Sequence, residues 1–196
     1  MVFYKEWISL DKRYFRLLIM ISEMGGTFTG NLSDIHRTIS RNPSLVNVQT
    51  KTREEIKKAI DYLEHNKFIN CTKFGRMYSL SIIPFEKQEE LSNDNYEKIR
   101  NYNFRGEVSW EETLRVYLWL YVDCISGEEK EYITQSMIES DLRISTSTIG
   151  CAEKHLEKGL GAISIQYISE VVGTDENGND VYHRKGHKVT ITAYWN

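Results

Sequence analysis

The chain has 196 residues, of which 40% are hydrophobic and 27% are charged, and its formal net charge is −3. This length and composition suit one or two globular domains. The longest apolar run, 116–122, is too short to span a bilayer, and the N-terminus has no basic start with an apolar region and a small-residue cleavage site. We therefore expect a cytoplasmic protein.

The charge is divided unevenly along the chain. Residues 1–90 hold 14 Lys/Arg against 11 Asp/Glu, a balance of +3, and residues 91–105 hold 3 against 2. Residues 106–196 hold 8 Lys/Arg against 15 Asp/Glu, a balance of −7. The first part can therefore face nucleic-acid phosphate, whereas the last part is repelled by phosphate unless its positive charges are clustered.

Residues 1–83 are expected to form one domain that begins with two helices. A helix over 11–24 carries apolar residues at helical spacing and is stopped by two glycines. A short extended piece follows over 27–30. The side chain of Asn31 can then cap a second helix, which ends before a turn at 42–44.

A third helix is predicted to begin at Thr52, because Glu55 three residues later completes a capping-box pattern. The helix has an apolar face formed by Ile56, Ala59 and Leu63. Two strand-like segments follow, 68–72 and 77–83, and the residues between them predict a hairpin turn.

Residues 84–105 are polar and mix acidic with basic side chains. They are expected to be a linker, or to hold a short helix around 94–101. A second domain over 106–196 repeats the plan of the first. Its first helix begins at a capping box formed by Ser109 and Glu112.

The rest of the second domain also follows the plan of the first. A short strand at 132–133 precedes a helix capped by Thr134, and Ser145 opens a third helix. Two strands, 162–172 and 188–194, then predict an unusually long hairpin. Between them, the segment Asp175-Glu-Asn-Gly178-Asn is a tight-turn signal.

The third helices of the two domains carry one shared pattern. A hydroxyl residue suited to an N-cap precedes Ile, Ala and Leu at offsets 0, +3 and +7, and Glu comes next. In the second domain these residues are Ile149, Ala152, Leu156 and Glu157. A pattern that recurs with the same elements around it predicts two tandem domains of one architecture.

The string TREEIKKAIDYLEHNKFI at 52–69 resembles the third helix and first wing strand of bacterial winged-helix proteins, and ISTSTIGCAEKHLEKGLGAI at 144–163 is similar. The resemblance covers nearly the whole chain. It implies an α+β fold of two tandem winged helix-turn-helix domains, each with three helices and a β-hairpin wing. Such tandems occur in plasmid and phage replication initiators, in element-encoded regulators and in chromosome-segregation scaffolds, the last of which bind protein.

In a winged helix, the third helix enters the major groove and the wing crosses the DNA backbone. The expected DNA-binding residues of the first domain are Arg37, Arg41, Lys51, Arg53, Lys57, Lys58, Lys73 and Arg76. Of these, Arg53, Lys57 and Lys58 are expected in the groove, where side chains reach base edges. The alternative is an ordinary solvated helix face, because Glu54 and Asp61 dilute its positive charge.

The second domain offers hydroxyl groups and a basic hairpin. Its expected DNA-binding residues are Ser145, Thr146, Ser147, Lys154, Arg184 and Lys185. Hydroxyl groups can donate to phosphates or to base edges. The segment 183–188 is the densest basic cluster in the chain, but it follows the acidic turn at 175–180. The hairpin could therefore enter a minor groove, or its charges could pair internally.

The sequence gives no sign of a metal, a cofactor or an enzyme. Its three cysteines, at positions 71, 124 and 151, form no CxxC pair and no disulfide framework, so reduced thiols are expected. His183 and His187, and likewise Cys151 and His155, supply only two ligands per pair, whereas a structural zinc site needs four. No GxSxG, HExxH, P-loop or GxGxxG motif is present.

The expected function is sequence-specific binding of double-stranded DNA, as a transcriptional regulator or a replication initiator of a mobile element. The aromatic residues Tyr117, Trp119 and Tyr121 lie on a predicted first helix and suggest a core that also forms an interface. A homodimer could therefore form through the first helices. The alternative function is a tandem winged-helix scaffold whose acidic second domain binds a protein partner.

Overall fold

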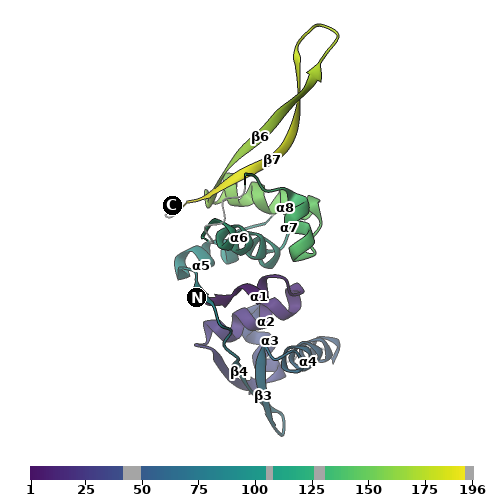
Figure 1. Cartoon of the computed structure of the whole chain (residues 1–196). Coiled ribbons are helices and arrows are strands. Elements are labelled where there is room, and N and C mark those ends of the chain that lie inside the picture. The colour runs from purple at the N-terminus through teal and green to yellow at the C-terminus, as the bar shows by residue number, and fades with distance from the viewer. Residues whose placement is uncertain (42–49, 105–107, 126–130, 193–196) are drawn as a thin grey trace. The chain divides into compact units, whose positions relative to one another are not determined.

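The computed structural model is a mixed α+β fold (Figure 1). It describes residues 1–41, 50–104, 108–125 and 131–192. The chain divides into two compact units, Met1–Asn93 and Asp94–Asn196. Across the described parts of the chain, the helices lack the length and apolarity needed to cross a membrane.

The first unit combines helices with two antiparallel sheets. Its elements are β1 (Val2–Tyr4), α1 (Lys5–Ile8), α2 (Lys12–Glu23), β2 (Thr27–Asn31), α3 (Leu32–Ser40), α4 (Thr50–His65), β3 (Ile69–Phe74), β4 (Met77–Ile82) and β5 (Gln88–Glu90). One sheet has the strand order β2-β4-β3, and the other pairs β1 with β5. The β3–β4 hairpin turns at Gly75, whose φ of 60° is in the left-handed region that glycine adopts readily.

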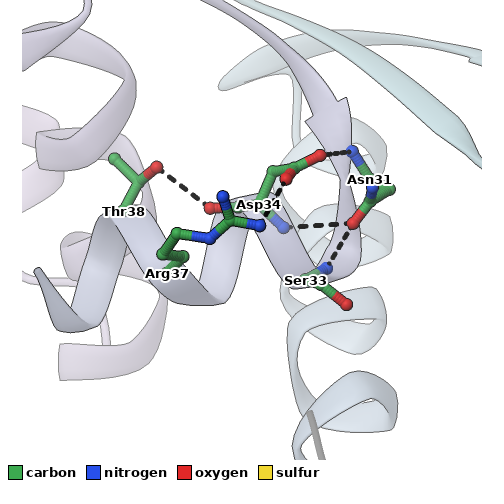
Figure 2. A network of polar contacts seen from close by, with 5 residues as sticks. All are labelled: Asn31, Ser33, Asp34, Arg37 and Thr38. Atoms are coloured by element: carbon green, nitrogen blue, oxygen red, sulfur yellow. Dashed lines mark hydrogen bonds and ion pairs between the residues drawn. The ribbon is translucent and has the colours of Figure 1, made fainter. Parts of the chain in front are cut away.

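Helix α3 begins at the cap that the sequence predicts. The side chain of Asn31 accepts hydrogen bonds from the backbone N–H of Ser33 (2.8 Å) and of Asp34 (3.1 Å), and the Asp34 carboxylate accepts from the N–H of Asn31 at 2.9 Å (Figure 2). This capping box satisfies N–H groups that have no partner within the helix. It fixes the point where β2 ends and α3 starts.

The predicted start of the third helix at Thr52 is wrong. Helix α4 already includes Thr50, so Thr52 is inside the helix rather than at its cap. A Thr followed three residues later by Glu55 marks a cap only when the backbone before it is non-helical, and sequence alone does not show that. The turn predicted at 42–44 lies outside the described residues.

The apolar face of α4 is buried, as its spacing predicts. The exposed fractions are 8% for Ile56, 5% for Ala59 and 0% for Leu63. Helix α4 packs against α2 and α3, where Leu17 and Ile35 are also buried. Burial of this face determines which side of α4 remains in contact with solvent.

The second unit has helices and one long antiparallel hairpin. Its elements are α5 (Asn93–Asn101), α6 (Trp110–Ile125), α7 (Gln135–Leu142), α8 (Thr146–Lys154), the π-helical turn η1 (His155–Gly159), β6 (Ile163–Thr174) and β7 (Asp180–Ile191). Ile133 forms a single antiparallel bridge with His187 in place of the predicted short strand. Figure 1 shows the outer part of β6 and β7 extending away from the helices of this unit.

The predicted helix starts of the second unit are confirmed. Ser109 and Glu112 form a capping box, in which the Glu112 carboxylate accepts from the Ser109 N–H at 2.9 Å. Thr134 caps α7 by accepting from Met137 N–H, and Ser145 caps α8 by accepting from Thr148 N–H. These caps set where α6, α7 and α8 begin.

The repeated Ile/Ala/Leu pattern is buried in this unit too. Ile149, Ala152 and Leu156 are each 0% exposed, and α8 packs against α6 and α7. The helix reaches Gly159, near its predicted end, but its last turn is π-helical. Both third helices therefore direct the same three residue types into the core of their own unit.

One further expectation needs correction. The second hairpin strand begins at Asp180 rather than at position 188, because register shifts let β7 stay paired through the glycine at position 186. Of the two alternatives for 84–105, the short helix expected around 94–101 is confirmed as α5, and the segment also holds β5, which the sequence did not predict. Strand β5 is stabilised by pairing with β1, a partner more than eighty residues away that local sequence does not show.

The buried face of α4 leads to a stability prediction. Leu63→Ala should lower the free energy of unfolding by about 2–5 kcal/mol, because it removes a fully buried side chain and leaves a cavity. Urea denaturation followed by circular dichroism would measure this change. The matched control is the exposed neighbour Glu64→Ala, expected within about 0.5 kcal/mol of the parent chain. Equal stability of the two variants would contradict the burial of this face.

Candidate nucleic-acid interface

The first unit has a basic hollow between its helices and its hairpin. The hollow has a volume of about 570 Å³ and receives Arg53 from α4 and Lys73 and Arg76 from the β3–β4 hairpin. Asn31 and Ser33, at the start of α3, form another part of its lining. None of the described residues that line it is acidic. The basic hollow is therefore suited to an anion.

The register of the three-stranded sheet creates this hollow. Gly30 pairs with Tyr78 and Asn31 pairs with Met77, so the hairpin lies beside the start of α3. The first turn of a helix presents its positive end, although Asp34 in the capping box offsets part of that charge. Lys73 also lies over the Tyr78 ring at 5.5 Å. Three elements that are distant in sequence thus contribute to one positive site.

The outward face of α4 carries the side chains that the sequence predicts for the groove. Arg53, Lys57 and Lys58 are exposed, as is Lys51 near the start of the helix. Lys51, Lys57 and Lys58 point away from the buried apolar face, whereas Arg53, three residues before Ile56, lies near the edge of that face at the start of the helix. Exposed acidic residues, including Glu54, share this surface. Arg53 is the residue that belongs to both the helix face and the basic hollow.

Two other predicted phosphate contacts are held by internal ion pairs. Arg37 donates to the Asp34 carboxylate at 3.0 Å, while the Thr38 hydroxyl donates to the Asp34 carbonyl (Figure 2). Arg41 donates to the Glu23 carboxylate at 2.8 Å. Neither Arg37 nor Arg41 lines the basic hollow. Such exposed ion pairs contribute little stability, so the structure does not prevent these side chains from moving to a phosphate.

The predicted hydroxyl residues of the second unit have structural contacts of their own. The Ser145 hydroxyl caps α8 and lies 3.0 Å from the Ser147 hydroxyl. Thr146 is half-buried, whereas Ser147 and Lys154 are exposed. Capping therefore already engages the Ser145 oxygen, and Ser147 and Lys154 are the more accessible groups on this helix.

The basic residues of the second hairpin also contact their own unit. The Arg184 guanidinium lies 3.7 Å from the centre of the Tyr167 ring. Lys185 forms a 3.6 Å ion pair with Glu170 and lies over the Tyr132 ring. These contacts agree with internal pairing, which the sequence left open as an alternative to a minor-groove role.

The tip of that hairpin is negatively charged. Asp175 accepts hydrogen bonds from the side chain and backbone of Asn179, and these bonds lower the pKa of its carboxyl group. Glu176 and Asp180 lie beside it and are exposed. The tip therefore stays anionic at neutral pH and repels phosphate, unlike the basic hollow of the first unit.

A buried polar cluster in the second unit was missed by the sequence interpretation. His187 Nε2 and Glu153 Oε1 are 2.9 Å apart, and the Gln135 amide donates to Glu153 Oε2 at 2.7 Å. His187 is 1% exposed and Glu153 is 4% exposed. The sign of this cluster in the sequence was Glu153, a carboxylate that directly follows the core residue Ala152 on the third helix. The cluster attaches the base of the hairpin to α7 and α8.

Backbone contacts hold the same hairpin base. Ile133 and His187 exchange two hydrogen bonds of 2.8 and 2.9 Å between their main chains. A Cβ atom on Gly186 would collide with the Tyr132 ring and the Ile133 carbonyl, so glycine is needed for this close approach. His187, considered above as half of a metal pair, thus has a structural role here.

No site for metal or disulfide chemistry stands out in the described residues. In that part of the chain, no group of three or more His, Cys, Asp or Glu side chains is placed to hold a metal ion. Cys71, Cys124 and Cys151 form no disulfide with one another. Burial raises the pKa of Cys71 and of Cys124, which keeps these thiols protonated at neutral pH.

No protein-family model matches the sequence, and no match is found among curated proteins.

The buried cluster leads to a second stability prediction. Glu153→Ala should destabilise the second unit by about 1–3 kcal/mol, because His187 and Gln135 lose their buried acceptor. Hydrogen exchange at the Ile133 and His187 amides should also become faster. The control is the exposed neighbour Lys154→Ala, and an identical stability and exchange pattern in the two variants would contradict an anchoring role.

Proposed function

We propose that this chain binds double-stranded DNA in a sequence-specific manner, as a regulator of transcription or an initiator of replication in a mobile element. We further propose that its two units are tandem winged helix-turn-helix domains. The order α2, β2, α3, α4 and the β3–β4 hairpin supports this for the first unit. In the second unit, α6, the bridge at Ile133, α7, α8 and the β6–β7 hairpin follow the same order.

The observation that carries the proposal is the basic hollow of the first unit. Arg53, Lys73 and Arg76 come from a helix and a hairpin, yet all three line it. A phosphate group needs convergent positive charge and hydrogen-bond donors, and arginine can supply two parallel donors to it. In the proposed complex, a backbone phosphate occupies the basic hollow and fixes the orientation of α4 on the duplex.

Sequence preference would come from the outward face of α4. With a phosphate in the basic hollow, Arg53 connects the backbone contact to the helix that enters the major groove. Lys57 and Lys58 follow it by about one turn and are exposed. Lysine and arginine side chains read guanine through its O6 and N7 acceptors.

The basic hollow is tested by removing two of its charges. Arg53→Ala combined with Arg76→Ala should weaken DNA binding and reduce the slope of log affinity against log salt by about one to two, since each lost phosphate contact reduces that slope by about one. Fluorescence anisotropy with the full chain and a labelled duplex at several salt concentrations measures both quantities.

The matched control removes two lysines elsewhere in the same unit, Lys5→Ala with Lys87→Ala, which do not line the basic hollow. Its net charge change equals that of the test variant. If both variants change affinity and slope equally, only net charge matters, and the hollow has no specific role as a phosphate site.

The helix face is tested separately through sequence preference. Selection of bound sequences from a random duplex pool should enrich one site for the parent chain. Lys57→Ala with Lys58→Ala should weaken binding and relax the preference at one or more positions, each by about 1–3 kcal/mol. A site enriched equally by parent and variant would contradict base reading by these lysines.

The second candidate function is a protein-interaction scaffold. It is favoured by the −7 balance of residues 106–196 and by the anionic tip of the second hairpin. Under this function, the full chain would show no salt-dependent affinity for any duplex, and the selection above would enrich nothing.

A further inference from the structure

The outer part of the second hairpin exposes apolar side chains and two strand edges. Val171, Val172, Val181 and Tyr182 are 52%, 58%, 41% and 65% exposed. Two-stranded ribbons present unpaired backbone groups along both edges, and proteins usually cover, charge or shorten such edges. Here each strand runs for twelve residues. This arm is therefore suited to pairing with another strand.

The base of the arm is fixed, which leaves a defined free segment. On the β7 edge, Ile133 already pairs with His187 through two backbone hydrogen bonds. On the β6 edge, the Ile165 N–H donates to the Glu157 side chain. The open part of β7 therefore begins beyond His187 and runs outward to Asp180.

The ladder shows which residues of this open segment face outward. In an antiparallel pair, alternate rungs direct their backbone groups toward the partner strand and away from it. The Tyr167–His187 rung directs the backbone of His187 outward, to Ile133. Counting rungs outward from this one, every second rung has the same orientation, and the β7 residues of these rungs are, in order, Arg184, Tyr182 and Asp180. These three residues therefore offer their N–H and C=O groups to an incoming strand.

We propose that this segment of β7, residues 180–184, pairs antiparallel with the same segment of a second copy of the chain. Centred on Tyr182, the two-fold arrangement places Asp180 of each chain opposite Arg184 of the other. A symmetric dimer needs such a self-complementary surface, and opposite charges across an antiparallel pair stabilise it. The exposed Val181 and Tyr182 side chains would be covered in the same contact.

The charge pattern favours pairing through the β7 edge rather than the β6 edge, and with a second copy of the chain rather than with DNA. Glu170 is the one charged residue of β6, so self-pairing of the other edge places no acid opposite a base. DNA is disfavoured at the arm because Asp175 and Glu176 make the adjacent tip anionic. The paired segment is short, so we expect a dimer that depends on protein concentration.

The experiment measures association of the full chain without DNA, which keeps it independent of the proposed function. Sedimentation equilibrium over a range of concentrations should show a monomer–dimer equilibrium for the parent chain. Asp180→Arg alone, or Arg184→Asp alone, places like charges opposite each other twice and should weaken dimerisation about tenfold or more. The two changes combined should restore it.

The matched control is Glu176→Arg, which makes the same charge change in the turn, outside the paired segment. It should leave dimerisation within about twofold of the parent. A parent chain that remains monomeric at its highest attainable concentration would overturn the proposal. A dimer unaffected by the single changes, or not restored by the double change, would equally overturn it and would favour another interface, such as the first helices.

Discussion

Burial of one apolar stripe on the third helix of each unit is the constraint on which the rest of the structure depends. Helix α4, and α8 together with its continuation η1, direct Ile, Ala and Leu into the core of their own unit. Once that face is fixed, the side chains on the opposite face must meet solvent. In α4 this exposes basic side chains mixed with acidic ones, whereas in α8 the exposed residues are Ser147 and Lys154. One packing rule thus produces two chemically different surfaces.

The two hairpins differ in charge in the same way. The short β3–β4 hairpin brings Lys73 and Arg76 to the basic hollow beside α3. The long β6–β7 hairpin ends in an anionic turn, and its basic residues contact Tyr167 and Glu170 of their own unit. Phosphate attraction is therefore concentrated in the first unit, which agrees with the uneven charge along the sequence. The second unit is better equipped for contact between polypeptide strands.

Local signals predicted the helices and hairpins because caps and apolar spacing act within a few residues. The cap at Asn31 and the capping box at Ser109 were both visible in this way. The start of α4 was not, because a capping pattern inside a helix looks the same as one at its end. The pairing of β5 with β1 and the basic hollow depend on contacts between distant segments. Sequence could predict which residues of the candidate site are exposed, but not that Arg53, Lys73 and Arg76 share one hollow.

The basic segment 183–188 shows how tertiary contacts divide a single run of sequence. His187 is buried against Glu153, and Gly186 lets the hairpin approach Tyr132. Lys185, directly before Gly186, is half-buried, and Arg184 is exposed on the outer part of the arm. The buried residues hold the base in place, so the exposed ones are presented on a strand of fixed direction and register. A cluster that looks like a uniform phosphate-binding patch in sequence therefore separates into an anchor and a presented strand edge.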